Sequence, residues 1–291
     1  MTVKATISVI IVNFNSGDLL VECVNAVLAS TVPVAIYIVD NASTDNSLQQ
    51  LKRICDARLI IVKHTSNLGF ARAANSVLPQ TVGDYLLFLN PDCFIKTDTL
   101  ARFYAVMEQY PHVGMAGCLV QDPDGTEQAG CRRSIPSPWR SMVRVLHLDK
   151  LFPHHPRFQS FVLSQQPLPL QPIELEGISG ACMFVRRTAL EDVGQMDETY
   201  FLHCEDLDWF MRFRAKQWVI LFIPDIEVIH LKGACSKSQP LRVLWYKHRG
   251  MIRFYRKFFR HQYPLPIMGI VILAVWVRFT LLAIMTLIYR S

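Results

Sequence analysis

The sequence predicts an α/β fold in which a mostly parallel sheet is flanked by helices and followed by a C-terminal membrane-associated helix. Three observations predict it. Short apolar runs rich in β-branched residues alternate with segments of helical spacing over residues 7–120. Repeated strand–helix–strand units of this kind form parallel sheets covered by helices. Polar residues follow several of these runs directly, and residues 264–291 are strongly apolar.

The N-terminal part contains the regular alternation. Residues 7–12 are almost continuously apolar, which is typical of a strand buried on both faces. Ser43 or Thr44 is a suitable N-cap for a helix. The same criteria predict strands at 7–12, 35–39, 59–62, 85–89 and 113–120, and helices at 18–29, 43–54, 70–78 and 97–109.

The rest of the chain is less regular. Residues 121–174 are rich in Pro, Gly and His, so we expect long loops with one helix at about 139–148 and no separate domain. Regular structure returns as strands at 181–185 and 219–222 and a helix at 205–216. The predicted organisation is a main α/β domain at 1–245, a basic juxtamembrane helix at 246–263 and a membrane-associated helical tail at 264–291.

The net charge of +6 suggests an anionic partner. Much of the excess lies in residues 247–260, directly before the apolar tail. A basic cluster in that position more often contacts anionic lipid headgroups than nucleic acid. A mean hydropathy of +0.22 is high for a wholly soluble protein. We therefore expect a membrane as a partner, and no nucleic acid.

The apolar tail contains one charge, Arg278, between residues 267 and 289, and it is long enough to span a bilayer. An arginine near the centre of a spanning helix costs about 2.5–3.5 kcal/mol on insertion scales. That cost favours a tilted or re-entrant helix, or one that lies in the interface with Arg278 reaching toward water. A buried helical hairpin of the main domain is the alternative that involves no membrane.

The cysteines and the N-terminus indicate the compartment. Eight cysteines form no CxxC pairs, which is typical of reduced thiols in a cytosolic protein. Residues 1–5 lead straight into the first strand, with no apolar leader and no cleavage site. We expect the main domain on the cytoplasmic face of the cell membrane (the inner membrane), anchored by the C-terminal helix.

Two polar segments follow predicted strands at the edge where sites of parallel sheets form. Asp40 ends one strand, and its carboxylate can accept N–H donors of a base or ribose hydroxyls, although it could also simply cap a helix. Asn67 and Arg72 belong to a segment that opens a helix, where N–H groups and the arginine favour a phosphate. A glycine near a helix start is ordinary, and GxGxxG spacing is absent.

A third segment, Asn90–Asp92, ends an apolar strand with an acid. A hard divalent cation takes oxygen ligands and often binds through one or two carboxylates plus substrate phosphates. The alternative is an Asn-Pro-Asp turn with no metal. His230 also follows a strand-like run. A lone histidine is more often structural, but together with Asp92 and diphosphate oxygens it makes a cation site.

A fourth segment concentrates acids at the start of the helix predicted at 205–216. Such acids complement the helix dipole, so part of the cluster can be purely stabilising. Closely spaced carboxylates also raise one another's pKa, which suits a general base. Asp206 is the better candidate for that base, because Asp208 and Arg212 have the spacing of a structural i,i+4 pair. Glu205 has no assigned chemistry.

Taken in order, these segments resemble family 2 glycosyltransferases with the Rossmann-like GT-A fold, and most closely their rhamnosyltransferase-like members. The resemblance spans about residues 7–260. It is carried by six blocks in register together with a final histidine and glycine: 8–15, 39–45, 67–75, 90–92, 177–181, 197–212, and His230 with Gly233. Asn90 stands where the fuller Asp-x-Asp pattern has an acid, which lowers the local charge.

The resemblance implies roles for the matched residues. Asp40 would contact the nucleotide base, and Asp92 with His230 would bind Mg²⁺ or Mn²⁺. Asp206 would take the proton from the acceptor hydroxyl. The remaining donor-binding positions would be Asn13, Asn15, Asn67, Arg72 and Asn90, and Gly180, Glu205, Asp208 and Arg212 would support the acceptor side.

The implied function is inverting transfer of a sugar from a nucleotide-diphospho-sugar, dTDP-rhamnose-like or a UDP-sugar. The acceptor would be a hydroxyl of a polyprenyl-diphosphate-linked glycan in cell-surface polysaccharide synthesis. The alternative outside enzymes is a membrane-tethered nucleotide-sugar-binding protein with a degenerate transferase site. A nucleotidyltransferase or dinucleotide-binding oxidoreductase also uses a parallel sheet. The missing GxGxxG and the absence of a basic phosphate-attack signature count against both.

Overall fold

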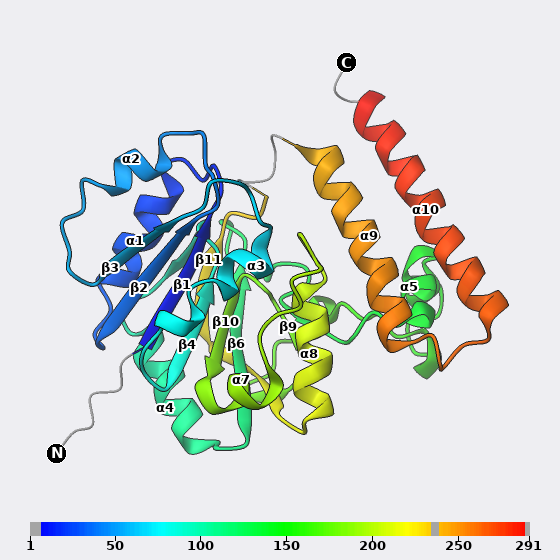
Figure 1. Cartoon of the computed structure of the whole chain (residues 1–291). Coiled ribbons are helices and arrows are strands. Elements are labelled where there is room, and N and C mark those ends of the chain that lie inside the picture. Colours follow the sequence, from blue (N-terminus) through cyan, green and yellow to red (C-terminus); the bar gives the residue numbers. More distant parts are fainter. Residues whose placement is uncertain (1–6, 234–238, 289–291) are drawn as a thin grey trace.

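The computed structural model describes residues 7–233 and 239–288, and its centre is a nine-stranded mixed sheet (Figure 1). Eight strands follow the order β3-β2-β1-β4-β10-β6-β11-β5, and β8 pairs with β11. The strands are β1 (Ile7–Asn13), β2 (Val34–Asp40), β3 (Leu59–Lys63), β4 (Tyr85–Leu89), β5 (Cys93–Ile95), β6 (Val113–Gln121), β8 (Ile173–Glu174), β10 (Cys182–Arg186) and β11 (Val219–His230).

The sheet is mostly parallel, as predicted. Strands β3, β2, β1 and β4 pair in parallel, and so do β6 and β11. Strand β10 lies antiparallel between β4 and β6, so those two strands run in the same direction. Strands β5 and β8, which also pair with β11, are antiparallel to it. The carboxyl ends of β1, β2, β4, β6 and β11 therefore lie along one edge.

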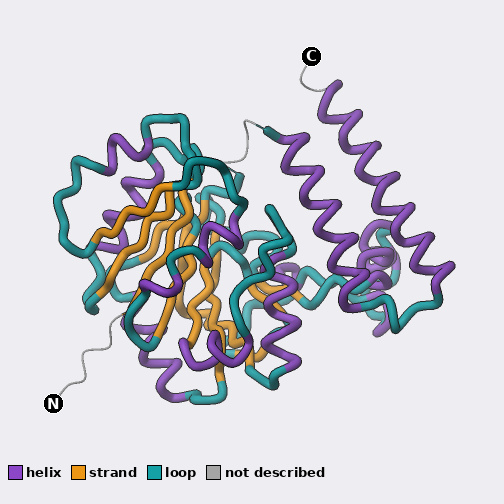
Figure 2. The backbone as a smooth tube through the Cα atoms, in the orientation of Figure 1, coloured by secondary structure: helices purple, strands orange, loops and turns teal. Residues whose placement is uncertain are grey.

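Helices α1 (Leu19–Leu28), α2 (Ser47–Leu51), α3 (Phe70–Asn75), α4 (Thr99–Gln109), α7 (Arg187–Val193) and α8 (Glu205–Ala215) flank the sheet (Figure 2). The predicted helix at 43–54 was too long. Residues before Ser47 form a turn because the Asn15 side chain accepts hydrogen bonds from the backbone N–H groups of Thr44 and Asp45. A local side-chain acceptor of this kind competes with helix formation.

The region at 121–174 contains long loops with short elements. Helix α5 (Pro138–Val145) corresponds to the predicted helix, and α6 (Leu148–Leu151) follows it. Strand β7 (Arg132–Arg133) pairs with β9 (Gly177–Ile178) in a separate two-stranded sheet. This small sheet joins the start of the loop region to the segment before β10, and it carries Arg133 toward the acidic run.

Strand β11 continues to His230, eight residues beyond the predicted end at 222. Its extension pairs with β5, so that Cys93 lies directly opposite His230. The sequence signal failed because this part of the strand carries Pro224, Asp225 and Glu227, which interrupt the apolar run and coincide with a register shift against β6. The longer strand is what brings His230 to the edge that carries Asp92.

Helices α9 (Pro240–Phe258) and α10 (Leu265–Ile288) run antiparallel and side by side, with α9 nearer the sheet (Figure 1). Helix α9 begins at Pro240, six residues before the start predicted for the juxtamembrane helix, and packs on the main domain. Phe254 and Tyr255 of α9 are buried in the same core as the sheet. None of the seven described cysteines forms a disulfide; Cys235 and residues 289–291 lie outside the described residues.

Candidate active site

The ends of β1 and β2 form one polar cluster. Asn13 and Asp40 are direct register partners, and both are buried. The Asn13 Nδ2 group donates to Asp40 Oδ1 at 2.8 Å, and to the hydroxyl oxygens of Ser43 and Ser47 at 3.0 Å each. Asn13 Oδ1 is buried without a hydrogen-bond partner among the described residues. A buried acceptor without a partner is costly, so this oxygen is available to a ligand donor.

Asn15 has a structural role next to this cluster. Its φ of 55° is left-handed, a conformation that asparagine tolerates better than most residues. Its backbone N–H donates to the Ser43 hydroxyl, and its side chain holds the N–H groups of Thr44 and Asp45. Asn15 thus fixes the loop after Asp40. A direct contact between Asn15 and a nucleoside stays a prediction.

The segment from Asn67 is held by a side chain that the sequence did not single out. Asn41 donates to Asn67 Oδ1 at 3.0 Å and accepts from the backbone N–H of Leu68 at 2.8 Å. Gly69 has φ +83°, and a Cβ there would overlap the carbonyl oxygen of Phe201. The glycine is therefore needed because another backbone passes against it, and Phe70 N–H donates to the same carbonyl.

Arg72 and Asn90 differ in how they are placed. Arg72 is exposed and lies 3.7 Å from Glu198, so its guanidinium is free to move toward a ligand. Asn90 is fixed through its backbone, because its N–H donates to Ala181 O and its carbonyl accepts from Cys93 N–H. These bonds seat the Asn90–Asp92 turn between β4 and β10. The donor-binding roles of both side chains stay predictions.

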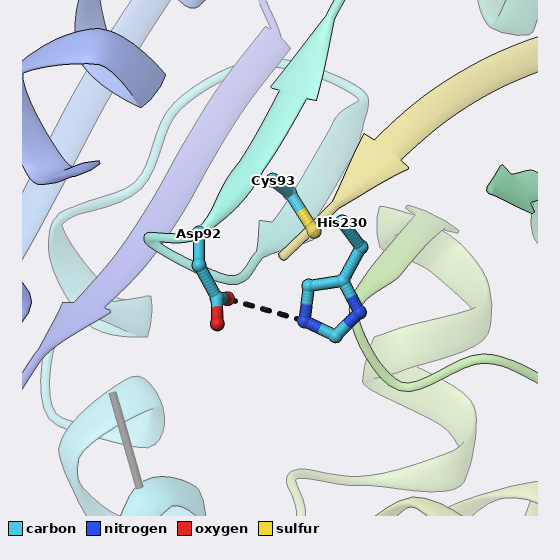
Figure 3. A group of neighbouring side chains, drawn as sticks. All are labelled: Asp92, Cys93 and His230. Carbon is cyan, nitrogen blue, oxygen red and sulfur yellow. Dashed lines mark ion pairs between the residues drawn. The ribbon is translucent and has the colours of Figure 1, made fainter. Parts of the chain in front are cut away.

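Asp92 and His230 meet at the sheet edge as predicted (Figure 3). Both are buried, and Asp92 Oδ1 lies 3.2 Å from His230 Nε2. The two segments are also joined through the backbone, because Leu231 N–H donates to Asp92 O at 3.0 Å. Cys93 lies beside them, and one ligand atom from each of the three residues falls within 4.8 Å of the others.

Gln128, which the sequence did not single out, orients His230. Its Nε2 group donates to Asp122 Oδ1 at 2.7 Å and to the His230 carbonyl at 3.2 Å. Because the amide nitrogen faces these acceptors, Oε1 is the atom 2.7 Å from His230 Nδ1, and Nδ1 carries a hydrogen. The other ring nitrogen, Nε2, therefore faces the Asp92 carboxylate, 3.2 Å from Oδ1.

This donor set fits a divalent metal. Carboxylate oxygen and neutral imidazole nitrogen suit Mn²⁺, and Mg²⁺ binds through few protein ligands plus substrate phosphates. Burial, followed by the nearby Cys182 and Asp92, raises the pKa of the Cys93 thiol well above its ordinary value, so Cys93 stays protonated. A thiol is a poor ligand for a hard cation. The candidate ligands are therefore Asp92 and His230.

The acidic run begins at a distorted turn. His203 and Cys204 both have left-handed backbones, with φ of 66° and 71°. Such conformations cost free energy and are enriched at functional sites. Glu205 follows, buried, with Oε2 lacking a hydrogen-bond partner among the described residues. Burial and the neighbouring charge of Asp206 raise the pKa of Glu205 to about 8, so its carboxyl is mostly protonated at neutral pH.

Asp206 lies in a different environment. One of its carboxylate oxygens, Oδ2, forms an ion pair with Arg133, whose Nε also donates to Ile178 O. The other, Oδ1, accepts the backbone N–H of Leu207 at 2.8 Å. Gly180 lies against this carboxylate, since a Cβ there would approach Oδ2 to 3.0 Å. Arg133 was missed because 73 residues separate it from Asp206.

Asp208 forms the structural pair that its spacing predicts. Its Oδ1 accepts from Arg212 Nε at 2.8 Å, and its side chain is fully buried. Its Oδ2 accepts from Lys257 of α9 at 2.5 Å. Arg212 also donates to the carbonyls of Val193 and Gln195, so it fixes the loop after α7. Neither oxygen of Asp208 is left without a partner.

Comparison with known proteins agrees with these features. Residues 8–194 match the family model described as Glycosyl transferase family 2. An N-acetylglucosaminyl-diphospho-decaprenol L-rhamnosyltransferase of Mycobacterium tuberculosis is 28% identical over 239 residues, which cover 78% of this chain and 76% of that protein. The rhamnosyltransferase WbbL of Escherichia coli K12 is 24% identical over 60% of this chain and 62% of its own length.

Among solved structures, a mannosyltransferase from Pyrobaculum calidifontis in complex with GDP-mannose and Mn²⁺ superposes with a TM-score of 0.61 at 18% identity. The match covers 96% of this chain and 70% of that one. At this identity the likeness concerns the fold, and it confirms the expected GT-A architecture.

Proposed function

The chain belongs to glycosyl transferase family 2 and is a glycosyltransferase, and on that premise we propose an inverting enzyme that uses a nucleotide-diphospho-sugar. The donor is dTDP-rhamnose-like or a UDP-sugar. The acceptor is a hydroxyl of a polyprenyl-diphosphate-linked glycan. The product belongs to cell-surface polysaccharide synthesis.

The observation that carries the proposal is the buried contact between Asp92 and His230 at the carboxyl edge of the sheet. Gln128 holds the His230 ring through Nδ1, so that Nε2 faces the carboxylate. Such a pair is built for a cation, and the anion that this cation would serve is the diphosphate of the donor. The same edge carries Asn13 and Asp40, which support the nucleoside end of the donor.

Asp92 and His230 would hold Mg²⁺ or Mn²⁺, which neutralises charge on the diphosphate when it is bound. The chain's own residues do the rest. Asn13 offers its Oδ1, which has no partner among the residues described, to an N–H of the base next to the Asp40 carboxylate. The exposed guanidinium of Arg72 pairs with a phosphate oxygen of the donor. These contacts orient the sugar–phosphate bond.

Asp206 is the group that accepts the proton of the incoming hydroxyl. Arg133 holds one carboxylate oxygen, and the Leu207 N–H contacts the other, so the acid has a fixed direction. As the hydroxyl oxygen bonds to the anomeric carbon, its proton passes to the Asp206 carboxylate. The sugar–oxygen bond to the diphosphate breaks with its electron pair remaining on the phosphate oxygen. A single in-line displacement inverts the anomeric centre.

The lipid-linked acceptor is supported by two features. The mycobacterial relative carries a diphospho-decaprenol acceptor in its name. Helix α10 is 24 residues long, with a mean hydropathy of 2.4 in its most apolar window and only 6% of that window buried. An apolar helix with so little cover fits membrane attachment. We therefore place the enzyme at the cytoplasmic face of the cell membrane, anchored through α10.

Release of nucleoside diphosphate from a panel of nucleotide-sugars, with a lipid-linked glycan acceptor and with Mn²⁺ or a chelator, tests the proposal. We expect one donor class to be consumed, with Mn²⁺ required. Asp92→Asn should abolish release, whereas Asp225→Asn, an exposed acid in a surface ion pair, should not. Donor binding without release in every condition would favour the alternative of a membrane-tethered nucleotide-sugar-binding protein.

A further inference from the structure

We propose that helix α5 and the turns after it form a second membrane-contacting surface, which rests on anionic phospholipid. This α5 surface consists of the exposed apolar side chains of Trp139, Met142, Val145, Leu146, Leu151 and Phe152. The inference rests on the proposed action at a membrane-embedded acceptor, and it assigns to the loop region a role in holding the enzyme on the bilayer.

The spacing of these residues makes α5 amphipathic. Trp139, Met142 and Val145 or Leu146 recur every three or four positions, so they lie on one face of the helix. Val145 and Leu146 are 57% and 58% exposed, whereas Val143 on the other face is completely buried. Large apolar side chains grouped on one exposed face mark an interaction site more often than isolated ones do.

The segment after α5 extends the same surface. Leu151 is 68% exposed and Phe152 is 47% exposed. Phe158 packs against both Phe152 and Trp139, with ring centroids 5.6 Å and 6.1 Å apart. The Trp139 indole N–H donates to Arg157 O at 2.8 Å. These contacts hold the apolar groups in one preformed patch, so little ordering is needed when it meets a partner.

The charges around the α5 surface indicate which kind of partner it contacts. Asp149 is the only acid in residues 138–158, and its side chain is only 7% exposed beside Arg144. Lys150 and Arg157 are exposed. An apolar face with an exposed cationic rim matches the surface of anionic phospholipid. A second copy of the chain would place like charges together, and this disfavours self-association as the use of the patch.

The α5 surface is connected through α9 to helix α10, the proposed membrane anchor. Tyr255 of α9 donates its hydroxyl hydrogen to Ser141 of α5 at 2.6 Å. Helix α9 in turn packs against α10, and Figure 1 shows α5 next to the C-terminal part of α9. Attachment through α10 alone would leave the tilt of the whole protein on the bilayer undefined. A second contact through α5 fixes the direction in which the sheet edge faces.

Quenching of tryptophan fluorescence by brominated lipid acyl chains tests the proposal on the full chain, in phosphatidylglycerol-containing vesicles. The contribution of Trp139 to the quenched fluorescence, called the Trp139 share, is the difference in quenching between wild type and Trp139→Phe. We expect this share to be quenched, and Met142→Gln with Val145→Gln to reduce its quenching by at least about threefold, because two side chains of the apolar face are lost. Val82→Gln, a similarly exposed valine far from α5 in the sequence, serves as the matched control.

The outcomes separate the two proposals. Vesicle flotation of the full chain reports attachment, and nucleoside diphosphate release with a water-soluble acceptor analogue reports folding and transfer. If the protein floats and transfers sugar but the Trp139 share is not quenched, the α5 surface does not contact lipid and this inference fails alone. If the α5 double variant lowers the mass of an oligomer and leaves quenching unchanged, the patch serves self-association. An equal loss of Trp139 quenching in the Val82→Gln control would also overturn the proposal of lipid contact through the α5 surface.

Discussion

At the scale of single residues, the acidic run shows how much environment matters. Glu205, Asp206 and Asp208 lie within four positions, yet each has a different state. Glu205 is buried with an oxygen that lacks a partner among the described residues, and burial raises its pKa. Asp206 pairs with Arg133, and Asp208 is held by Arg212 and Lys257. Only Asp206 combines a defined orientation with partial exposure, so it remains the candidate base.

Asp206→Asn should reduce transfer by about 10²–10⁴-fold, because an amide cannot accept the hydroxyl proton. Donor affinity should change by no more than a few fold, since Asp206 acts on the acceptor side. Turnover and donor dissociation constant measured separately check this. Asp225→Asn is the control, because that acid lies in an exposed surface pair. Undiminished turnover in Asp206→Asn would exclude the residue as base.

Glu205→Gln should remove a pH dependence of stability. The pKa of Glu205 is about 8 in the folded state against an ordinary value of 4.5, so folding favours the protonated acid. The contribution of Glu205 to the free energy of unfolding is therefore fully present below pH 4.5. This contribution, on the order of a few kcal/mol in all, is lost as pH rises toward about 8. Urea unfolding of wild type between pH 5 and 9 should show this slope. A parallel slope in the glutamine variant would assign it to another group.

Gln128→Leu should weaken metal binding without touching a ligand. The change removes the acceptor that holds the His230 ring through Nδ1, with Nε2 facing Asp92. Loss of such an outer partner typically costs 10–100-fold in metal affinity. Titration of Mn²⁺ into the protein with nucleoside diphosphate, followed by electron paramagnetic resonance, measures it. Gln165→Leu, at an exposed turn, should bind as wild type does. Equal affinity in Gln128→Leu would leave Gln128 a structural role only.

At the scale of elements, close backbone contacts assemble the site from distant segments. The turn into α3 rests on the segment before α8, through Gly69 and the carbonyl of Phe201. The small sheet of β7 and β9 brings Arg133 to the start of α8. The long strand β11 carries His230 to Asp92. Each of these contacts depends on the path of the backbone, which local secondary-structure propensities do not encode.

Gly69→Ala should destabilise the fold and disturb donor binding. A methyl group at this position meets the Phe201 carbonyl, and the φ of +83° adds strain. We expect a loss of about 2–4 kcal/mol, combining overpacking with the left-handed backbone. Gly125→Ala is a matched control, because it has the same φ with nothing within 4 Å. It should lose only about 1 kcal/mol. Equal losses in thermal unfolding would show that the Phe201 contact is unimportant.

At the scale of the whole molecule, α9 joins the catalytic domain to the membrane helix. Lys257 and Arg253 of α9 bind Asp197, so part of the predicted lipid-binding cluster is used inside the protein. Burial raises the pKa of Asp197, but the bonds from Lys257, Thr199 and Arg253 outweigh it and lower the pKa below its ordinary range. Arg278 of α10 lies 3.0 Å from His248 of α9. This contact gives the charge in the apolar helix a polar partner.

Deletion of residues 264–291 should abolish membrane attachment that withstands high salt, because α10 supplies the large exposed apolar surface. Any binding left through the α5 surface should be released at about 1 M salt, where surface charges are screened. Flotation at low and high salt compares the two proteins. Salt-resistant attachment of the shortened chain would show that another segment anchors it.

The sequence alone determined the elements with strong periodicity and the chemistry at strand ends. It predicted the parallel strands β1 to β4, the edge that gathers Asn13, Asp40 and Asp92, and the i,i+4 pair of Asp208 with Arg212. These features follow from local rules, since apolar runs make buried strands and parallel strands end together. The apolar tail was equally easy to predict, because amino-acid composition alone identifies it.

Only the tertiary structure decided which distant side chains meet. Arg133 reaches Asp206 across 73 residues, and Gln128 reaches His230 across 102. Antiparallel β10 in the centre of the sheet and the start of α9 at Pro240 also depend on packing. Such contacts depend on how the loops return to the sheet. The pattern of residues along the chain does not give the spatial distance between segments that are far apart in sequence. The candidate base and the candidate metal ligands could therefore be singled out from the sequence, whereas the partners that orient them could not.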